Sequence, residues 1–211
     1  MTTTFSLINR TIALLLAVSL TVISYFYLDT GIAQFIYRIL NSNDRLLQTA
    51  ANIPDLLLHI VITITALSWV GYFIQARRDI HNRLTNFLRA IGTVTPMAFV
   101  VKTGLQYVFG RPDPYAWLLT HEPPCFYWFR DGEGYGGFPS GHMTVFAALM
   151  TTSSYYYPRY RSVYLGSLCL LALALITTDH HFLSDALAGA LLGWILAFIT
   201  IITVRKAGVI V

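Results

Sequence analysis

The sequence predicts an all-α protein, a polytopic bundle of six transmembrane helices. Of its 211 residues, 55% are hydrophobic and only 11% are charged, and the mean hydropathy is +0.59. Soluble domains carry about 25% charged residues, so this composition is typical of a membrane protein. Apolar stretches close to the roughly 20 residues that cross a bilayer fill most of the chain. We therefore expect one domain over residues 1–211, without a linker.

Six apolar stretches define the expected helices. They cover Thr11–Leu28, Leu56–Ile74, Leu88–Val108, Met143–Tyr157, Val163–Thr178 and Ala186–Val204. The fourth and fifth are short, and tilting or extension into their flanks would let them span. The first stretch, preceded by Arg10, can also be read as a signal peptide. Because no small-residue cleavage site follows it, we favour a retained span.

Local signals mark where the later helices begin and end. The third stretch stops at Arg111-Pro112, because proline cannot continue a helix. Ser140 is a good N-cap for the fourth helix. The sixth begins near His181 or at Ser184 as its N-cap. Within it, the pair Gly189-x3-Gly193 predicts a close helix contact inside the bundle.

The charges favour one orientation in the membrane. The net charge is +4, but no basic stripe or nucleic-acid motif is present, so we expect no nucleic-acid partner. With the N-terminus inside, most Lys and Arg residues fall on the inner side, as the positive-inside rule requires. The inner set is Arg10, Arg77, Arg78, Arg83, Arg89, Arg159, Arg161, Arg205 and Lys206. The outer set is Arg38, Arg45, Lys102, Arg111 and Arg130.

This orientation brings the Pro139-Ser140-Gly141-His142 turn to the outer face, at the start of the fourth helix. Free N–H groups at a helix start bind phosphate, and Gly141 permits a close approach. His142, in the first turn, can protonate a leaving oxygen. The alternative is an ordinary cap followed by an interfacial histidine.

A second polar group, His181 and Asp185, lies at the outer end of the sixth helix. Their spacing of four permits contact on a helix. A carboxylate that accepts the Nδ1 proton of a histidine frees Nε2 to attack. His180 is a rival nucleophile, and Asp179 is another orienting acid. The guanidinium of Arg111 suits bidentate phosphate recognition. The plain alternative is a helix boundary marked by polar residues.

Taken together, these elements resemble the type-2 phosphatidic acid phosphatase family of membrane phosphatases. That family carries Lys-x6-Arg-Pro, Pro-Ser-Gly-His and Ser-Arg-x5-His-x3-Asp elements in that order. The chain matches the second in full, at Pro139-Ser140-Gly141-His142, and the end of the third, at His181-x3-Asp185. By motif the resemblance covers about residues 100–190, and by its six spans it covers the whole chain.

The resemblance implies a single integral membrane phosphatase domain that acts on a phosphorylated lipid and needs no metal or other cofactor. His181 would be the nucleophile that forms a phosphohistidine, Asp185 would orient it, and His142 would protonate the leaving group. The phosphate-binding residues would be Arg111, Ser140, Gly141 and Lys102. Candidate substrates are undecaprenyl diphosphate, phosphatidylglycerol phosphate, phosphatidic acid and lipid A phosphates. We expect a bacterial inner-membrane location, with cytoplasmic termini and the active site facing the periplasm or outside.

The first family element is irregular in this chain. Eight residues, not six, separate Lys102 from Arg111. On a continuous helix this spacing turns the two side chains to opposite faces, unless Gly104 or Gly110 breaks the helix. Lys102 can instead be an ammonium that snorkels toward the headgroups. The alternative register, Gln106-x6-Asp113-Pro114, lacks phosphate-binding cations.

The third family element lacks its arginine, because Leu175 stands at that position. Arg130, on the outer loop, is a candidate replacement. We expect the chain to tolerate Leu175→Arg, since an arginine near a helix end can snorkel.

Two further features are open in the sequence. The outer loop, residues 113–138, is rich in aromatic residues and predicts either an interfacial belt or a lid over a headgroup. Cys125 and Cys169 are expected at different membrane depths, without a disulfide.

The alternatives to a phosphatase are a lipid-to-lipid phosphotransferase that uses the same histidine and a non-catalytic lipid-binding relative. Membrane lipids are the expected surroundings, and the oligomeric state is open.

Overall fold

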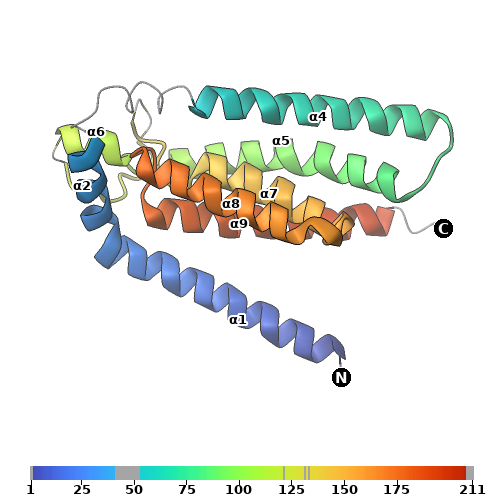
Figure 1. Ribbon diagram of the computed structural model, residues 1–211, viewed down its shortest axis with the longest axis horizontal. Helices are drawn as coiled ribbons and strands as arrows, with labels where there is room; N and C mark the ends of the chain where they lie inside the picture. Colours follow the sequence, from blue (N-terminus) through green and yellow to red (C-terminus); the bar gives the residue numbers. More distant parts are fainter. Residues whose placement is uncertain (1, 41–52, 121, 131, 133, 208–211) are drawn as a thin grey trace.

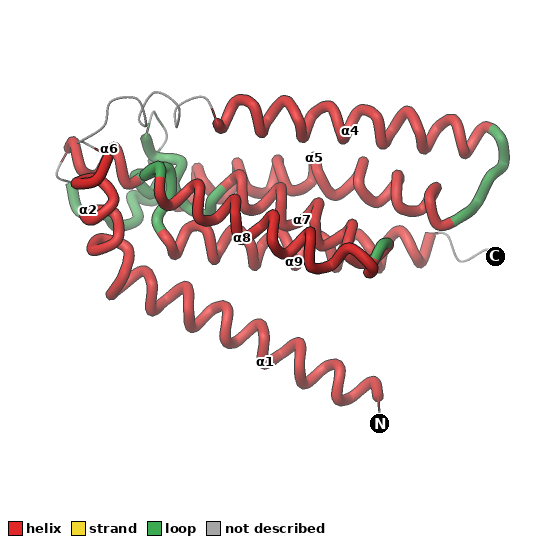
Figure 2. Tube along the Cα trace, viewed as in Figure 1, coloured by secondary structure: helices red, strands yellow, loops and turns green. Residues whose placement is uncertain are grey.

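A computed structural model of the chain describes residues 2–40, 53–120, 122–130, 132 and 134–207. Within these ranges the chain forms helices and loops and no strand, which confirms the all-α prediction (Figure 2). The helices are α1 (Thr2–Ile23), α2 (Asp29–Leu40), α4 (Ile53–Arg77), α5 (Arg83–Phe109), α6 (Pro114–Thr120), α7 (Gly141–Tyr156), α8 (Arg161–Thr177) and α9 (Leu183–Ala207). A π-helical turn, Ser24–Leu28, joins α1 to α2, and a 3₁₀ turn, Pro158–Tyr160, precedes α8.

The long helices α1, α4, α5, α7, α8 and α9 coincide with the six predicted spans. Among the described residues, five segments are long and apolar enough to cross a membrane, namely Thr11–Ile39, His59–Arg77, Arg83–Thr120, Pro158–Thr177 and Leu183–Lys206. Helix α7 has only 16 residues, about 24 Å of helix. This is shorter than the hydrocarbon core of a bilayer. Most of α7 is buried among the other helices of the bundle.

Helix α7 is the centre of the bundle. It packs against α5, α8 and α9, and α4 packs on α5 (Figure 1). The main apolar cluster contains Val61, Val94, Ala98, Val145, Ala148, Leu196 and Ala197, which come from α4, α5, α7 and α9. These side chains are mostly small, so the helix axes lie close together.

The predicted small-residue contact of α9 is made with α7. A Cβ atom on Gly193 would lie 2.3 Å from the carbonyl oxygen of Thr144, and one on Gly189 would lie 2.6 Å from that of Ser140. Neither separation is sterically possible, so both positions require glycine. Because Gly189 is one turn beyond Asp185, this contact also holds the start of α9 against the start of α7.

Helix α1 diverges from the other helices toward its N-terminal end (Figure 1). Its C-terminal end continues through the π-helical turn into α2, and this junction contacts α9. Ser24 and Asp29, the residues that bound this i→i+5 turn, are both buried. The π-helical turn therefore directs Asp29 into the protein, and such turns often occur at functional sites.

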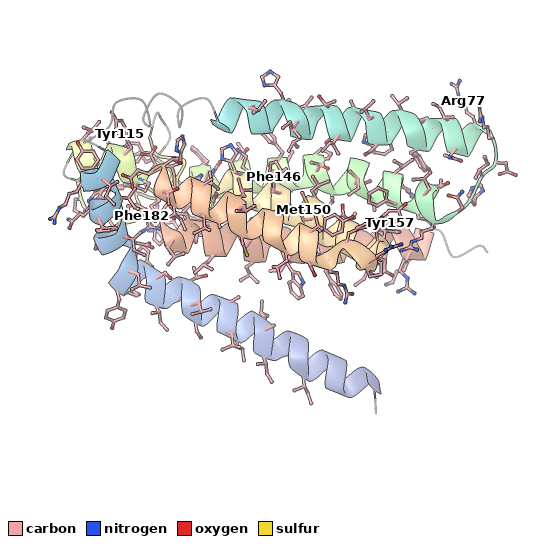
Figure 3. All side chains as sticks on the ribbon, in the orientation of Figure 1. Arg77, Tyr115, Phe146, Met150, Tyr157 and Phe182 are labelled. Carbon is pink, nitrogen blue, oxygen red and sulfur yellow. The ribbon has the colours of Figure 1, made fainter. Side chains whose placement is uncertain are left out.

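The predicted polar motifs meet at one end of the bundle. Figure 3 shows Tyr115 and Phe182 at that end, and Arg77 and Tyr157 at the opposite end. The last turn of α9, with its basic residues Arg205 and Lys206, also lies at the opposite end (Figure 1). Of the charged residues used to predict the orientation, Arg45 lies outside the described residues.

Candidate active site

The start of α7 is capped as predicted. The Ser140 hydroxyl accepts a hydrogen bond from the Met143 amide at 3.4 Å, and Gly141 and His142 occupy the first two helical positions. The Ser140 amide donates to the main-chain carbonyl of Asp185 at 3.0 Å. This bond joins the Pro-Ser-Gly-His turn directly to the first turn of α9.

A main-chain carbonyl holds the ring of His181. The Nδ1 atom lies 3.1 Å from the carbonyl oxygen of Gly137. Since a carbonyl only accepts, Nδ1 carries the proton and Nε2 keeps its lone pair. Asp185 Oδ2 is 4.0 Å from the same Nδ1 atom, which is beyond hydrogen-bond distance. The carboxylate that was predicted to orient the ring is therefore close enough to act through its charge, while Gly137 fixes the tautomer.

His142 and His181 converge from different elements. Their ring centroids are 6.1 Å apart and the ring planes are inclined by 62°. Burial lowers the pKa of the His181 imidazole to about 3, with smaller contributions from His142 and His180. His181 is therefore neutral at physiological pH, which is the state that a nucleophile requires.

Asp185 is fixed by the start of α9. It is fully buried in the first turn, where Oδ2 accepts the Phe182 amide at 3.0 Å. This is half of a capping box, in which an acid at the third helical position satisfies the amide of the capping residue. Helix α9 begins at Leu183, so Ser184 lies inside the helix and is not its N-cap. The other oxygen of Asp185 accepts a hydrogen bond from Arg111.

Arg111 lies at the predicted end of the third long helix, and its guanidinium is buried. Its side chain is 1% exposed. Nη1 donates to Asp185 and to the Ser184 hydroxyl at 2.7 Å, and Nη2 donates to Asp29 at 2.8 Å. Both terminal nitrogens of the predicted phosphate-binding arginine are therefore bonded to protein groups. The guanidinium is enclosed behind Asp185, between the rings of Tyr25 and Phe182 at 4.7 and 4.4 Å.

The end of α5 explains the position of Arg111. Gly110 adopts a left-handed conformation with φ of 53°, and a Cβ atom there would lie 2.1 Å from the Tyr127 carbonyl oxygen. Glycine is the usual residue at such a helix C-cap. The chain turns inward at this glycine, so Arg111 leaves the helix and enters the interior.

Lys102 reaches the start of α7. A Cβ atom on Gly141 would lie 3.2 Å from Lys102 Nζ, so the ammonium lies against the Pro-Ser-Gly-His turn. Nζ donates to Gln106 Oε1 at 3.2 Å, and the Gln106 amide donates to the carbonyls of Gly136 and Pro139. Helix α5 is continuous through Gly104 but ends at Gly110, one of the two glycines at which a break was expected, so the simple helical relation between Lys102 and Arg111 does not hold.

The two positions linked to the missing family arginine do not supply a cation to this turn. Arg130 is half-exposed, forms an ion pair with Glu122 at 3.2 Å and lies 3.9 Å from the Tyr135 ring centroid. Leu175 is 2% exposed and packs with Met143 and Ala186. Leu175 thus lies in the packed interior and not at a surface from which an arginine could snorkel, so we expect Leu175→Arg to destabilise the fold.

Sequence reasoning missed two groups at this site. Asp29 is buried and bonds Arg111 and the Ser184 amide, although in sequence it only ends the first apolar run. The Gly137 carbonyl carries no side-chain signal at all. The aromatic loop contributes Phe126, which stacks on Tyr25 at 5.2 Å and thereby covers Arg111.

Within the described ranges, no three His, Cys, Asp or Glu side chains gather into a metal-binding group. Cys125 and Cys169 are both free.

An apolar cavity of about 290 Å³ lies beside the site. Its lining residues are Val18, Thr21, Val22, Leu105, Phe109, Phe138, Pro139, Ala188, Leu191, Leu192 and Ile195.

Comparison with known proteins gives both a family and relatives. The profile of the PAP2 superfamily matches residues 87–208. Lipid A 1-phosphatase from Rhizobium etli is 25% identical over 145 residues, which cover 68% of this chain and 54% of that protein. Lipid A 1-phosphatase from Rhizobium johnstonii gives the same identity and covers 52% of its length. The chain thus spans about half the length of the curated relatives it matches, and no solved structure matches it significantly.

Proposed function

The chain belongs to the PAP2 superfamily, and we propose that it is an integral membrane phosphatase that removes a phosphate group from a lipid through a phosphohistidine at His181. The observation that carries this proposal is the His181 ring itself. It is buried, neutral and held at Nδ1 by Gly137, with a second imidazole 6.1 Å away. A histidine in this state presents Nε2 as a nucleophile beside a proton donor.

The proposed reaction has two steps. Nε2 of His181 attacks the phosphorus atom, the bond from phosphorus to the lipid oxygen breaks, and that oxygen takes a proton from the imidazolium of His142. The neutral His142 then accepts a proton from water, whose oxygen attacks the phosphohistidine. The phosphorus–nitrogen bond breaks, inorganic phosphate leaves, and both histidines return to their starting states.

Lys102 and the start of α7 are proposed to bind the phosphoryl oxygens. The ammonium lies against Gly141, and the first amides of α7 point out of the helix at the same turn. Positive charge and free amides at this place stabilise the charge that develops in phosphoryl transfer. Ser140 supports this group by capping the helix. Arg111 takes no part in direct phosphate binding, because Asp29 and Asp185 occupy its terminal nitrogens.

A lipid substrate is supported by the apolar cavity between α1, α5 and α9. It reaches Pro139, the residue before Ser140, so an acyl chain lying there has its headgroup beside the turn. The curated relatives are named lipid A 1-phosphatases, which makes lipid A 1-phosphate one candidate. Undecaprenyl diphosphate, phosphatidylglycerol phosphate and phosphatidic acid are the others. We propose that the site faces the outer side of a bacterial inner membrane, with both termini cytoplasmic.

The test is release of inorganic phosphate from these four lipids by the purified protein in detergent. We expect release from at least one lipid, and a fall of at least about 10²-fold in His181→Ala and His142→Ala. His81→Ala, an exposed histidine at the opposite end of the bundle, is the matched control and should keep full activity. Full activity in His181→Ala would refute the assigned nucleophile.

Two other outcomes identify the alternative functions. Transfer of labelled phosphate to a second lipid, without release, would indicate the phosphotransferase. Lipid binding without turnover on any of the four lipids would indicate the non-catalytic relative.

A further inference from the structure

We propose that Asp29 is a positioning residue for the reaction, which keeps a net negative charge beneath His181 by balancing the charge of Arg111. This inference rests on the proposed function, in which His181 gains positive charge as it is phosphorylated. Asp29 belongs to α2 and lies outside the residues that match the PAP2 profile. Its contacts, rather than any family motif, connect it to the site.

The Asp29 carboxylate accepts hydrogen bonds from two residues of the site. The donors are Arg111 Nη2 at 2.8 Å, the Ser184 amide at 3.0 Å and the Ser184 hydroxyl. The side chain of Asp29 is fully buried. The π-helical turn that precedes it directs it to this position. A buried carboxylate with three donors is held in one orientation, so it contributes a fixed charge.

The charges around Arg111 add to a negative value only when Asp29 is present. Arg111 contributes one positive charge, and Asp29 and Asp185 each contribute one negative charge, so the buried group carries a net charge of about −1. The aromatic rings around the guanidinium, from Tyr25, Phe126 and Phe182, carry no net charge. Without Asp29, Arg111 neutralises Asp185.

The position of Asp185 transmits this charge to the nucleophile. Its Oδ2 atom lies 4.0 Å from Nδ1 of His181. Because His181 and Asp185 are buried, a negative charge at this distance favours the positively charged phosphohistidine more than it would in solvent. Arg111 donates to the other oxygen of Asp185, and its positive charge offsets the negative charge of that carboxylate. The charge of Asp29 is needed to balance Arg111.

Asp29→Asn tests the proposal, because it keeps the size and one carbonyl acceptor while it removes the charge. We expect kcat on the best lipid substrate to fall at least about tenfold with KM unchanged, since no substrate contact is altered. Asp79→Asn, which removes an exposed carboxylate at the far end of the bundle, is the charge-matched control and should keep the wild-type kcat.

The charge-retaining variant Asp29→Glu separates charge from structure. It keeps the negative charge beside Arg111 while it changes the length of the side chain, so we expect its kcat to be at least about threefold higher than that of Asp29→Asn. A purely structural role predicts that Asp29→Glu is as slow as Asp29→Asn or slower, because asparagine keeps the size of the native side chain. A wild-type kcat in Asp29→Asn, or an Asp29→Glu variant no faster than Asp29→Asn, would overturn the proposal.

A substrate-independent measurement distinguishes this proposal from the proposed function. When Nε2 of His181 attacks a carbonyl carbon of diethyl pyrocarbonate and ethyl carbonate leaves, positive charge builds on the ring until Nδ1 loses its proton, and mass spectrometry measures the rate of this acylation. We expect Asp29→Asn to slow modification of His181 while the rate at exposed His81 stays the same. If the wild type releases phosphate from no lipid, the proposed function fails, and this rate still decides the role of Asp29. An equal His181 rate in both proteins would refute it.

Discussion

At His181, the group that holds the ring differs from the group that supplies charge. The Gly137 carbonyl accepts the Nδ1 proton, and Asp185 stands 4.0 Å away with its own oxygens bonded to Phe182 and Arg111. In the proposed mechanism, a fixed tautomer needs only the first contact. The buried ions beneath the histidine then act by their summed charge, which is how a residue as distant in sequence as Asp29 enters the reaction.

Lys102 is the residue whose proposed role is easiest to test by charge removal. We expect Lys102→Met to lower kcat/KM by about 10²-fold, because it removes the ammonium that lies against Gly141. Lys206→Met, in the last turn of α9 at the other end of the bundle, is the matched control. Phosphate-release kinetics measure both. Unchanged kinetics in Lys102→Met would leave phosphate binding to the α7 amides alone.

Asp179 predicts a pH dependence of stability. Burial, together with the nearby Asp113, raises its pKa to about 7. The unfolded carboxyl ionises near pH 4, so between about pH 4 and 7 the unfolded state loses a proton that the folded state keeps. Stability from this group therefore falls as the pH rises through that window and stays low above it.

Asp179→Asn removes this effect, and asparagine tolerates the positive φ of 51° at this position. We expect the variant to raise Tm more at pH 8 than at pH 4.5, as measured by thermal unfolding in detergent. Asp79→Asn is the control, because Asp79 also has a positive φ, 54°, but is exposed. An equal Tm gain at both pH values would contradict the assignment.

At the scale of elements, the contact between α7 and α9 determines where the site residues meet. Gly189 and Gly193 let the two helices approach until Cβ atoms would clash with the α7 backbone. The starts of both helices are then joined by the bond from the Ser140 amide to the Asp185 carbonyl. The same packing that forms the core therefore brings the two histidine motifs together.

Gly193→Ala tests this contact. The added methyl group meets the Thr144 carbonyl, so we expect a loss of about 1–3 kcal/mol in the free energy of unfolding, together with reduced activity. Gly166→Ala is the matched control on α8, where a Cβ atom meets nothing within 4 Å. Alanine favours a helix over glycine by up to about 1 kcal/mol, so this control should be neutral or stabilising. Denaturant or thermal unfolding compares the two.

At the scale of the whole molecule, the bundle has two chemically different ends. The site, α2, α6 and the aromatic loop lie at one end, and Arg77 and the basic last turn of α9 lie at the other (Figures 1 and 3). Basic residues mark the cytoplasmic side of membrane proteins. This asymmetry supports an outward-facing site, where the proposed lipid headgroup lies at the membrane surface.

Labelling of single cysteines tests this orientation. In a protein whose Cys125 and Cys169 are replaced by serine, we expect an impermeant thiol reagent to label Thr120→Cys in intact cells. Ser162→Cys, an exposed position at the start of α8, should be labelled only after permeabilisation. The reverse pattern would place the site on the cytoplasmic side.

Much of the fold follows from local pattern. The lengths and spacing of the apolar runs predicted the six long helices, and the glycine spacing in α9 predicted its close contact. Ser140 was recognised as an N-cap, and Gly110 was named as a place where the helix before Arg111 could break. These features depend on residues within a few turns of one another, and helical periodicity makes such relations readable in a sequence.

The sequence by itself therefore determined the helices and the residues whose chemistry points to phosphate. Only the tertiary structure decided what each of those residues contacts. Arg111 bonds Asp29 from 82 positions away, and the ring of His181 is held by a carbonyl 44 positions away. Spacing along a chain does not encode such contacts, because they depend on the turn at Gly110 and on how closely α7 and α9 pack. A buried arginine satisfies its charge with the nearest carboxylates, and folding alone sets which carboxylates are near.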